Sequence, residues 1–209
     1  MSTTPFMNLR RLAAQRQAVE QCDLCSAPLR DGHRHLLEPE RRQLVCACDP
    51  CSILFSGHSD GRYRLVGDRI LYLLGFQMTD ELWDSLLIPV NMAFFFRSTV
   101  EGRVVPLYPS PAGATESLLG LEAWHELEEA NPVLREMEPD VEALLVNRVG
   151  SARDYYLVPI DRCYELVGLI RSGWRGLSGG TEVWKLVDGF FKDIEARAKR
   201  VGEAPSRDA

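Results

Sequence analysis

The sequence predicts an α+β protein in two parts, a small cysteine-rich module followed by an antiparallel sheet with helices packed on one of its faces. Five of the six cysteines lie between Cys22 and Cys51. Further along, residues 90–108 and 141–160 each read as two strands joined by a glycine-containing turn, and a helical pattern follows each of them. Hairpins followed by helices are typical of an antiparallel sheet covered by helices.

The composition supports a folded core and excludes several classes of protein. The 209 residues are 45% hydrophobic and carry a net charge of −6, so we expect no nucleic-acid partner. The longest apolar run, residues 86–96, is about half of what spans a bilayer, so we expect no membrane insertion. Residues 1–11 contain no apolar leader, and a cytoplasmic location is expected.

The chain divides by composition at the turn-rich residues 56–61. We expect an N-terminal helix within residues 1–21, because apolar residues recur on one helical face there. The remaining expected regions are the cysteine module at 22–60, the α+β domain at 61–200 and a disordered tail at 201–209.

Within the α+β domain, apolar periodicity and turn residues place the elements. Thr79 and Thr115 are the expected N-caps of two helices. The expected elements, in order, are strand-like residues 63–74, a helix at 79–87, strands at 90–97 and 103–108, a helix at 115–130, strands at 141–149 and 155–160, and helices at 161–172 and 181–200.

The cysteines form two C-x2-C pairs, Cys22 with Cys25 and Cys48 with Cys51. In a reducing compartment, close cysteines favour metal over disulfides, and four thiolates suit a tetrahedral Zn(II) ion. Residues 33–46 read as a hairpin that brings the pairs together. A closed set of four cysteines leaves no open coordination position, so we expect a structural site.

The second pair stands at an expected helix start. Asp49 reads as an N-cap, followed by Pro50 at the first helical position. A knuckle, a hairpin and a ligand pair at a helix start are typical of a treble clef, more than of a plain zinc ribbon. Pro50 also removes a backbone amide that would donate to the sulfur of Cys48, which favours zinc over a redox-active iron.

Cys46 is a second candidate for the third ligand. In a strand, Cys46 and Cys48 point to the same face, so either could bind the metal. The fifth thiol is otherwise a spare thiol, a core residue or a ligand of an exchangeable site. His33 and His35 also share a face, and the commoner interpretation of such residues is exposed or hydrogen-bonded strand histidines.

Residues 108–117 are expected to form a loop between a strand and a helix N-terminus. The loop offers four polar side chains near free helix amides, which can bind an anion: Ser110, Thr115, Glu116 and Ser117. The alternative is a rigid loop with a helix cap. The sequence contains no phosphate loop, dinucleotide fingerprint, Gly-x-Ser-x-Gly or His-Glu-x-x-His motif, so no catalytic residue is predicted.

Several segments together resemble an uncharacterised bacterial domain family. The resemblance extends over nearly the whole chain. It includes the two cysteine pairs and residues 33–37, 46–51, 54–55, 63–64, 88–90, 108–117, 139–148, 158–164 and 174–184. Such proteins are encoded beside uptake [NiFe]-hydrogenase genes, which implies a hydrogenase accessory, assembly or electron-transfer role. The resemblance supplies no catalytic residues.

Three functions follow as hypotheses. The first is a non-enzymatic, zinc-stabilised accessory protein that binds a hydrogenase subunit or maturation factor. The second is a redox or metal-delivery protein that uses the cysteine cluster for iron or nickel. The third is an enzyme with a site at residues 110–117.

Overall fold

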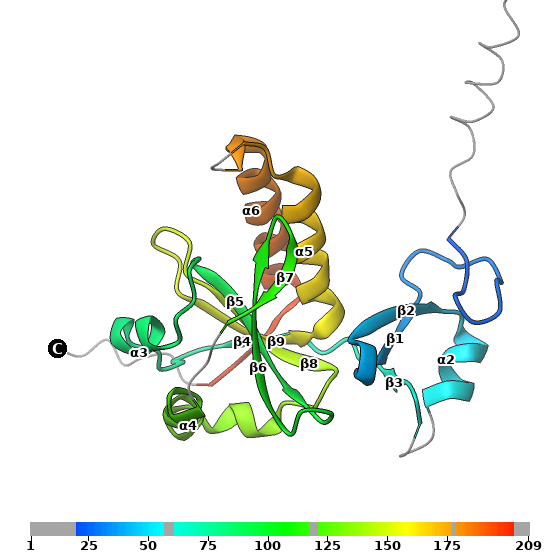
Figure 1. Cartoon of the computed structure of the whole chain (residues 1–209), viewed down its shortest axis with the longest axis horizontal. Coiled ribbons are helices and arrows are strands. Elements are labelled where there is room, and N and C mark those ends of the chain that lie inside the picture. The colour runs from blue at the N-terminus through cyan, green and yellow to red at the C-terminus, as the bar shows by residue number, and fades with distance from the viewer. Residues whose placement is uncertain (1–19, 57–60, 118–120, 177–178, 203–209) are drawn as a thin grey trace, which may run out of the picture. The chain divides into compact units, whose positions relative to one another are not determined.

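The computed structural model describes residues 20–56, 61–117, 121–176 and 179–202 (Figure 1). The expected N-terminal helix and the chain beyond residue 202 therefore lie outside the described residues. The chain divides into two compact units. Unit 1 runs up to Glu38 and resumes over Gln43–Leu65, and unit 2 comprises Pro39–Arg42 and the chain from Val66 onward. The sequence places this boundary after residue 60.

Unit 1 contains a three-stranded antiparallel sheet of order β2-β1-β3. The strands are β1 (Arg34–Glu38), β2 (Gln43–Ala47) and β3 (Arg64–Leu65), and the helix α2 (Asp49–Ser56) follows β2. The short 3₁₀ turn η1 (Pro39–Arg41) connects β1 to β2. The predicted hairpin and the helix after it are therefore present.

Unit 2 is built on a seven-stranded sheet of order β10-β4-β9-β8-β5-β6-β7. Its neighbouring strands are antiparallel, apart from the parallel pair β10 and β4. The strands are β4 (Leu71–Leu73), β5 (Met92–Ser98), β6 (Arg103–Ser110), β7 (Gly113–Glu116), β8 (Glu142–Asn147), β9 (Asp154–Pro159) and β10 (Lys199–Val201). The α+β class and the two predicted hairpins, β5–β6 and β8–β9, are confirmed.

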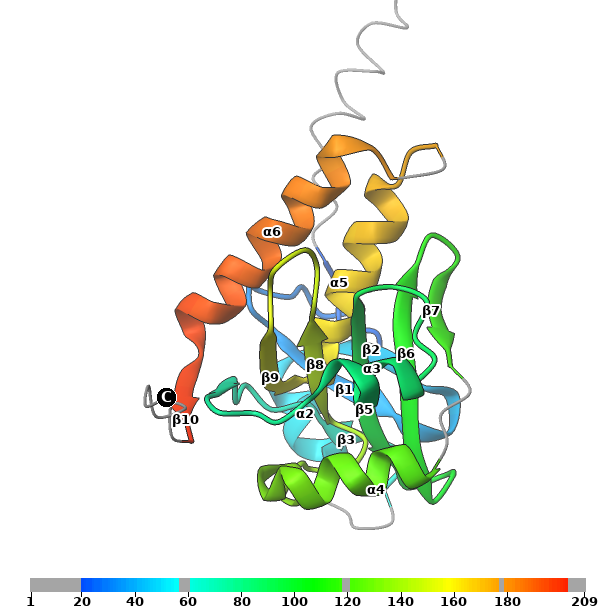
Figure 2. The same ribbon diagram turned by 90° about the vertical axis from the view of Figure 1, so that its left-hand side faces the viewer.

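Helices cover both faces of this sheet rather than one (Figure 2). Phe94 and Phe95 are adjacent in β5, so they point to opposite faces. Phe95 stacks on Trp124 with ring centroids 5.8 Å apart, whereas Phe94 meets Tyr164 at 6.0 Å. Because β5 is apolar on both faces, each face needs cover. The helices are α3 (Asp80–Ser85), α4 (Leu121–Ala130), the 3₁₀ turn η2 (Pro132–Glu136), α5 (Ile160–Gly173) and α6 (Gly180–Arg197).

The end of the fold differs from the prediction of a helix to residue 200 and a tail from 201. Helix α6 stops at Arg197, and β10 (Lys199–Val201) then joins the sheet beside β4. The N–H of Leu74 donates to the carbonyl of Val201 at 2.8 Å. Over the described ranges, no helix has the length and apolar character needed to cross a membrane.

Candidate metal centre

The first cysteine pair lies in a tight turn that the backbone closes on itself. The N–H of Ser26 donates to the carbonyl of Cys22 at 2.7 Å, and the N–H of Cys22 donates to the carbonyl of Ala27 at 2.8 Å. Ser26 adopts a positive φ of 62°, which reverses the chain after Cys25. This turn is the knuckle that a C-x2-C pair forms around a metal ion.

The second pair surrounds the start of α2. Cys48 directly precedes the helix, and Cys51 lies in its first turn. The N–H of Ser52 donates to the carbonyl of Cys48 at 2.9 Å, so the helical hydrogen bonds already begin at Cys48. Cys48, and not the predicted Asp49, therefore holds the position before the first helical residue, and both thiols lie on one short segment.

Asp23 ties the first turn to β2. Its N–H donates to the carbonyl of Cys46 at 2.9 Å, and its carboxylate accepts the N–H of Cys46 at 2.7 Å. These two hydrogen bonds fix the knuckle beside the end of β2, where the second pair begins. The hairpin thus brings the two cysteine pairs together in space, although they are far apart in the sequence.

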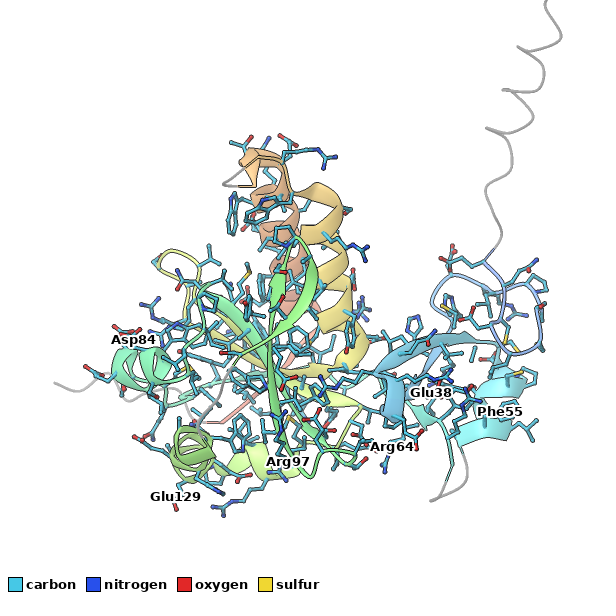
Figure 3. All side chains as sticks on the ribbon, in the orientation of Figure 1. Glu38, Phe55, Arg64, Asp84, Arg97 and Glu129 are labelled. Carbon is cyan, nitrogen blue, oxygen red and sulfur yellow. The ribbon has the colours of Figure 1, made fainter. Side chains whose placement is uncertain are left out.

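The four predicted cysteines meet in this position. The Sγ atoms of Cys22, Cys25, Cys48 and Cys51 all lie within 4.8 Å of one another, and Sγ of Cys25 is 3.6 Å from Sγ of Cys48. A tetrahedron with Zn–S bonds near 2.3 Å has S···S edges of about 3.8 Å. In Figure 3 the sulfur atoms (yellow) of unit 1 cluster near α2. The donor set and its spacing fit a tetrahedral metal ion.

The site carries opposing shifts in thiol pKa. Desolvation raises the pKa of Cys22, but backbone N–H groups of Cys48, Leu24 and Cys25 outweigh it, and the pKa falls to about 6. Desolvation, followed by contact with the other cysteines, raises the pKa of Cys51 to about 12. Four thiolates without a cation repel one another, so metal binding here releases protons.

Cys46 does not join this set. It lies opposite His35 across the β1–β2 pair, and its Sγ, with ring nitrogens of His33 and His35, forms a second group within 4.8 Å. Burial and the nearby carboxylates of Asp23 and Glu20 raise the pKa of Cys46. The sequence left Cys46 and Cys48 as alternatives for one ligand, but the structure separates them into two clusters.

The candidate anion-binding segment is a β-hairpin, so the predicted loop and the helix cap at Thr115 are wrong. Ser110 ends β6, and Thr115 and Glu116 lie in β7. The hydroxyl of Ser110 bonds to the carbonyl of Gly113 at 2.9 Å and the hydroxyl of Thr115 at 3.0 Å, which closes the turn. A strand presents no cluster of free helix amides, so the basis for anion binding is absent at these residues.

The last two residues of that segment make structural contacts. Glu116 accepts a hydrogen bond from Arg103 at 2.6 Å, and this bond, opposed by burial and aided by Arg42, lowers the pKa of Glu116. The hydroxyl of Ser117 donates to the carbonyl of Leu87 at 3.0 Å. The bond to Arg103 lies within the β6–β7 hairpin, and the bond from Ser117 joins the end of the hairpin to Leu87.

Together, the fold and the four-cysteine cluster define an α+β protein with a small N-terminal unit whose four close cysteines could hold a metal ion. The chain belongs to a family of unknown function (DUF5947), whose model matches residues 21–198. This agrees with the resemblance to an uncharacterised domain that covers nearly the whole chain. No curated protein and no solved structure matches the chain.

Proposed function

We propose that this chain is a non-enzymatic accessory protein whose unit 1 is held together by a structural Zn(II) ion. The observation that carries the proposal is the set of four cysteine Sγ atoms within 4.8 Å. Four protein ligands fill a tetrahedral zinc ion and leave no position for substrate, which suits a structural role.

The small core of unit 1 supports this role. Its buried apolar residues are Leu36, Val45 and Ala47, which pack with the two buried ligands Cys22 and Cys51. A core of this size supplies little hydrophobic stabilisation, and small modules commonly depend on a bound metal ion. Pro50 has no N–H to offer the sulfur of Cys48, which favours zinc over a redox-active iron.

Helix α2 offers a surface for a protein partner. Ile53 and Leu54 are 75% and 65% exposed, and Phe55 beside them is also exposed. Contiguous exposed apolar side chains are typical of interaction sites. We propose that the partner is a subunit or maturation factor of an uptake [NiFe]-hydrogenase, on the support of the resemblance described above, and that the protein acts in the cytoplasm.

Metal analysis and an absorption spectrum of the purified protein test the zinc site. We expect the unchanged protein to be colourless and to contain zinc. The Cys48→Ser variant should contain less zinc, because it lacks one ligand of the four-cysteine set. Thiolate-to-iron absorption bands that bleach on reduction would instead support a redox or metal-delivery protein and would overturn the structural assignment.

Binding to a purified hydrogenase subunit tests the partner. Leu54→Glu should weaken binding at least about tenfold, because a carboxylate buried without a partner in the interface costs more than the roughly 1.4 kcal/mol that a factor of ten requires. Val100→Glu is the matched control, because Val100 is 56% exposed in unit 2. Equal binding of both variants and the unchanged chain would contradict the assignment of α2, and no binding by the unchanged chain would contradict the partner.

A further inference from the structure

We infer that His33, His35 and Cys46 form a second metal site in unit 1, distinct from the four-cysteine set, which binds a divalent transition metal ion and leaves one coordination position open. One ligand atom from each residue lies within 4.8 Å of the other two. Two imidazoles and one thiolate are ligands that Zn(II), Co(II) and Ni(II) accept.

The β1–β2 register brings the three side chains together. Cys46 lies directly opposite His35 in the β1–β2 pair. Its side chain points away from the face of β2 that carries the buried Val45 and Ala47. His33 precedes His35 by two positions, so it points to the same face. The two imidazole rings meet edge to face with centroids 4.9 Å apart.

The hydrogen bonding of His33 prepares it as a ligand. Its Nδ1 lies 3.2 Å from the carbonyl of Arg30, which can only accept, so Nδ1 carries the hydrogen. The carboxylate of Glu20 is 3.5 Å from the same nitrogen. Nε2 then carries a lone pair, and it is buried with no hydrogen-bond partner among the described residues.

This is the arrangement that metal-ligating histidines show. The nitrogen away from the metal donates to a carbonyl or carboxylate, which fixes the tautomer and the ring orientation. A buried nitrogen without a partner is unfavourable, and a metal ion at Nε2 of His33 would satisfy it. The unsatisfied nitrogen and the three-residue cluster are therefore two separate observations that point to a metal ion bound at His33.

Nearby carboxylates favour a cation at this place. The carboxylate of Asp23 accepts the backbone N–H of Cys46 at 2.7 Å, and Glu20 lies beside His33. Three protein ligands leave a fourth position for water or an added ligand, unlike the closed cysteine set.

Metal stoichiometry of the full-length chain tests this inference. Reduced, metal-free protein is dialysed against Co(II), and bound metal is measured by mass spectrometry together with the absorption spectrum. We expect two ions per chain in the unchanged protein, one for each cluster. His33→Gln and Cys46→Ser should each bind one ion and keep the intense sulfur-to-cobalt bands of the four-thiolate site.

The same bands report that unit 1 of each variant is folded. His125→Gln is the matched control, because His125 is exposed on α4, and it should still bind two ions. Cys48→Ser should lose the four-thiolate bands. One ion per chain in the unchanged protein would overturn the inference, as would two ions in both His33→Gln and Cys46→Ser.

Discussion

The two units differ in what fills their interiors. Unit 2 buries large apolar side chains on both faces of its sheet, and Phe94, Phe95, Leu144 and Leu157 are fully inaccessible. The buried cluster of unit 1 contains few apolar side chains, and two of its five residues are the cysteines Cys22 and Cys51. In unit 1, cysteine side chains thus occupy places that aliphatic residues hold in unit 2.

This difference separates the sources of stability of the two units. Burial of apolar surface stabilises unit 2 whatever the metal content of the solution. On the proposed structural role of zinc, unit 1 gains its stability from ligands that hold together around a cation, so its folding is coupled to metal binding and to the release of thiol protons. The two units should therefore respond to different perturbations.

The largest effect is expected from Cys22→Ser. Structural zinc sites bind with about 10–16 kcal/mol in small peptides, so loss of one buried ligand should unfold unit 1 and release the metal of the four-cysteine site. Hydrogen exchange of β1 and β2, with metal analysis, measures this. Cys46→Ser is the control that should keep this site, and full protection with bound metal in Cys22→Ser would refute the coupling.

Phe95→Ala should act on unit 2 alone. Phe95 is fully buried against Trp124, and truncation of such a residue costs about 3–5 kcal/mol of unfolding free energy. Urea unfolding followed by tryptophan fluorescence measures the loss. The metal content should stay unchanged, and a joint loss of metal and stability would show that the two units are not independent.

The smallest effect is expected from Glu116→Gln, and it should depend on pH. The pKa of Glu116 is lowered from 4.5, chiefly by Arg103, so its charge stabilises the fold above pH 4.5 and less as the pH falls through the lowered pKa. Glu116 is 37% exposed, so the loss at pH 7 is at most about 0.5 kcal/mol. Urea unfolding of Glu116→Gln and the unchanged chain, at pH 7 and at a pH below the lowered pKa, measures this loss of unfolding free energy. An equal loss at the two pH values would contradict an ionic cause.

The sequence predicted the elements that local patterns determine. Thr79 is the N-cap of α3, and its hydroxyl accepts the N–H of Leu82 at 3.1 Å. The two long hairpins have strong apolar strands on both sides of a turn. The helix at Asp49 follows from an acidic residue before Pro50. In each case the residues that decide the structure are close in sequence.

Elements that depend on distant partners were missed. Strand β10 exists because Lys199–Val201 pairs with Leu71–Leu73, far away in the sequence. Pro109 and Gly113 suggested a loop, yet tertiary pairing makes them part of the β6–β7 hairpin. At the metal site, the pairs were visible from spacing, but the separation of Cys46 from Cys48 depends on a hairpin register that spacing alone does not specify.

Hydrogen exchange with and without a chelator tests the central claim, that metal held by the four cysteines stabilises unit 1 alone. After metal removal from the reduced Cys46→Ser chain, which keeps the four-cysteine set and loses a ligand of the second cluster, we predict loss of amide protection in Arg34–Glu38 and Gln43–Ala47, unchanged protection in Glu142–Asn147, and recovery when zinc is added. Unchanged protection of β1 and β2 in the metal-free chain would contradict the account.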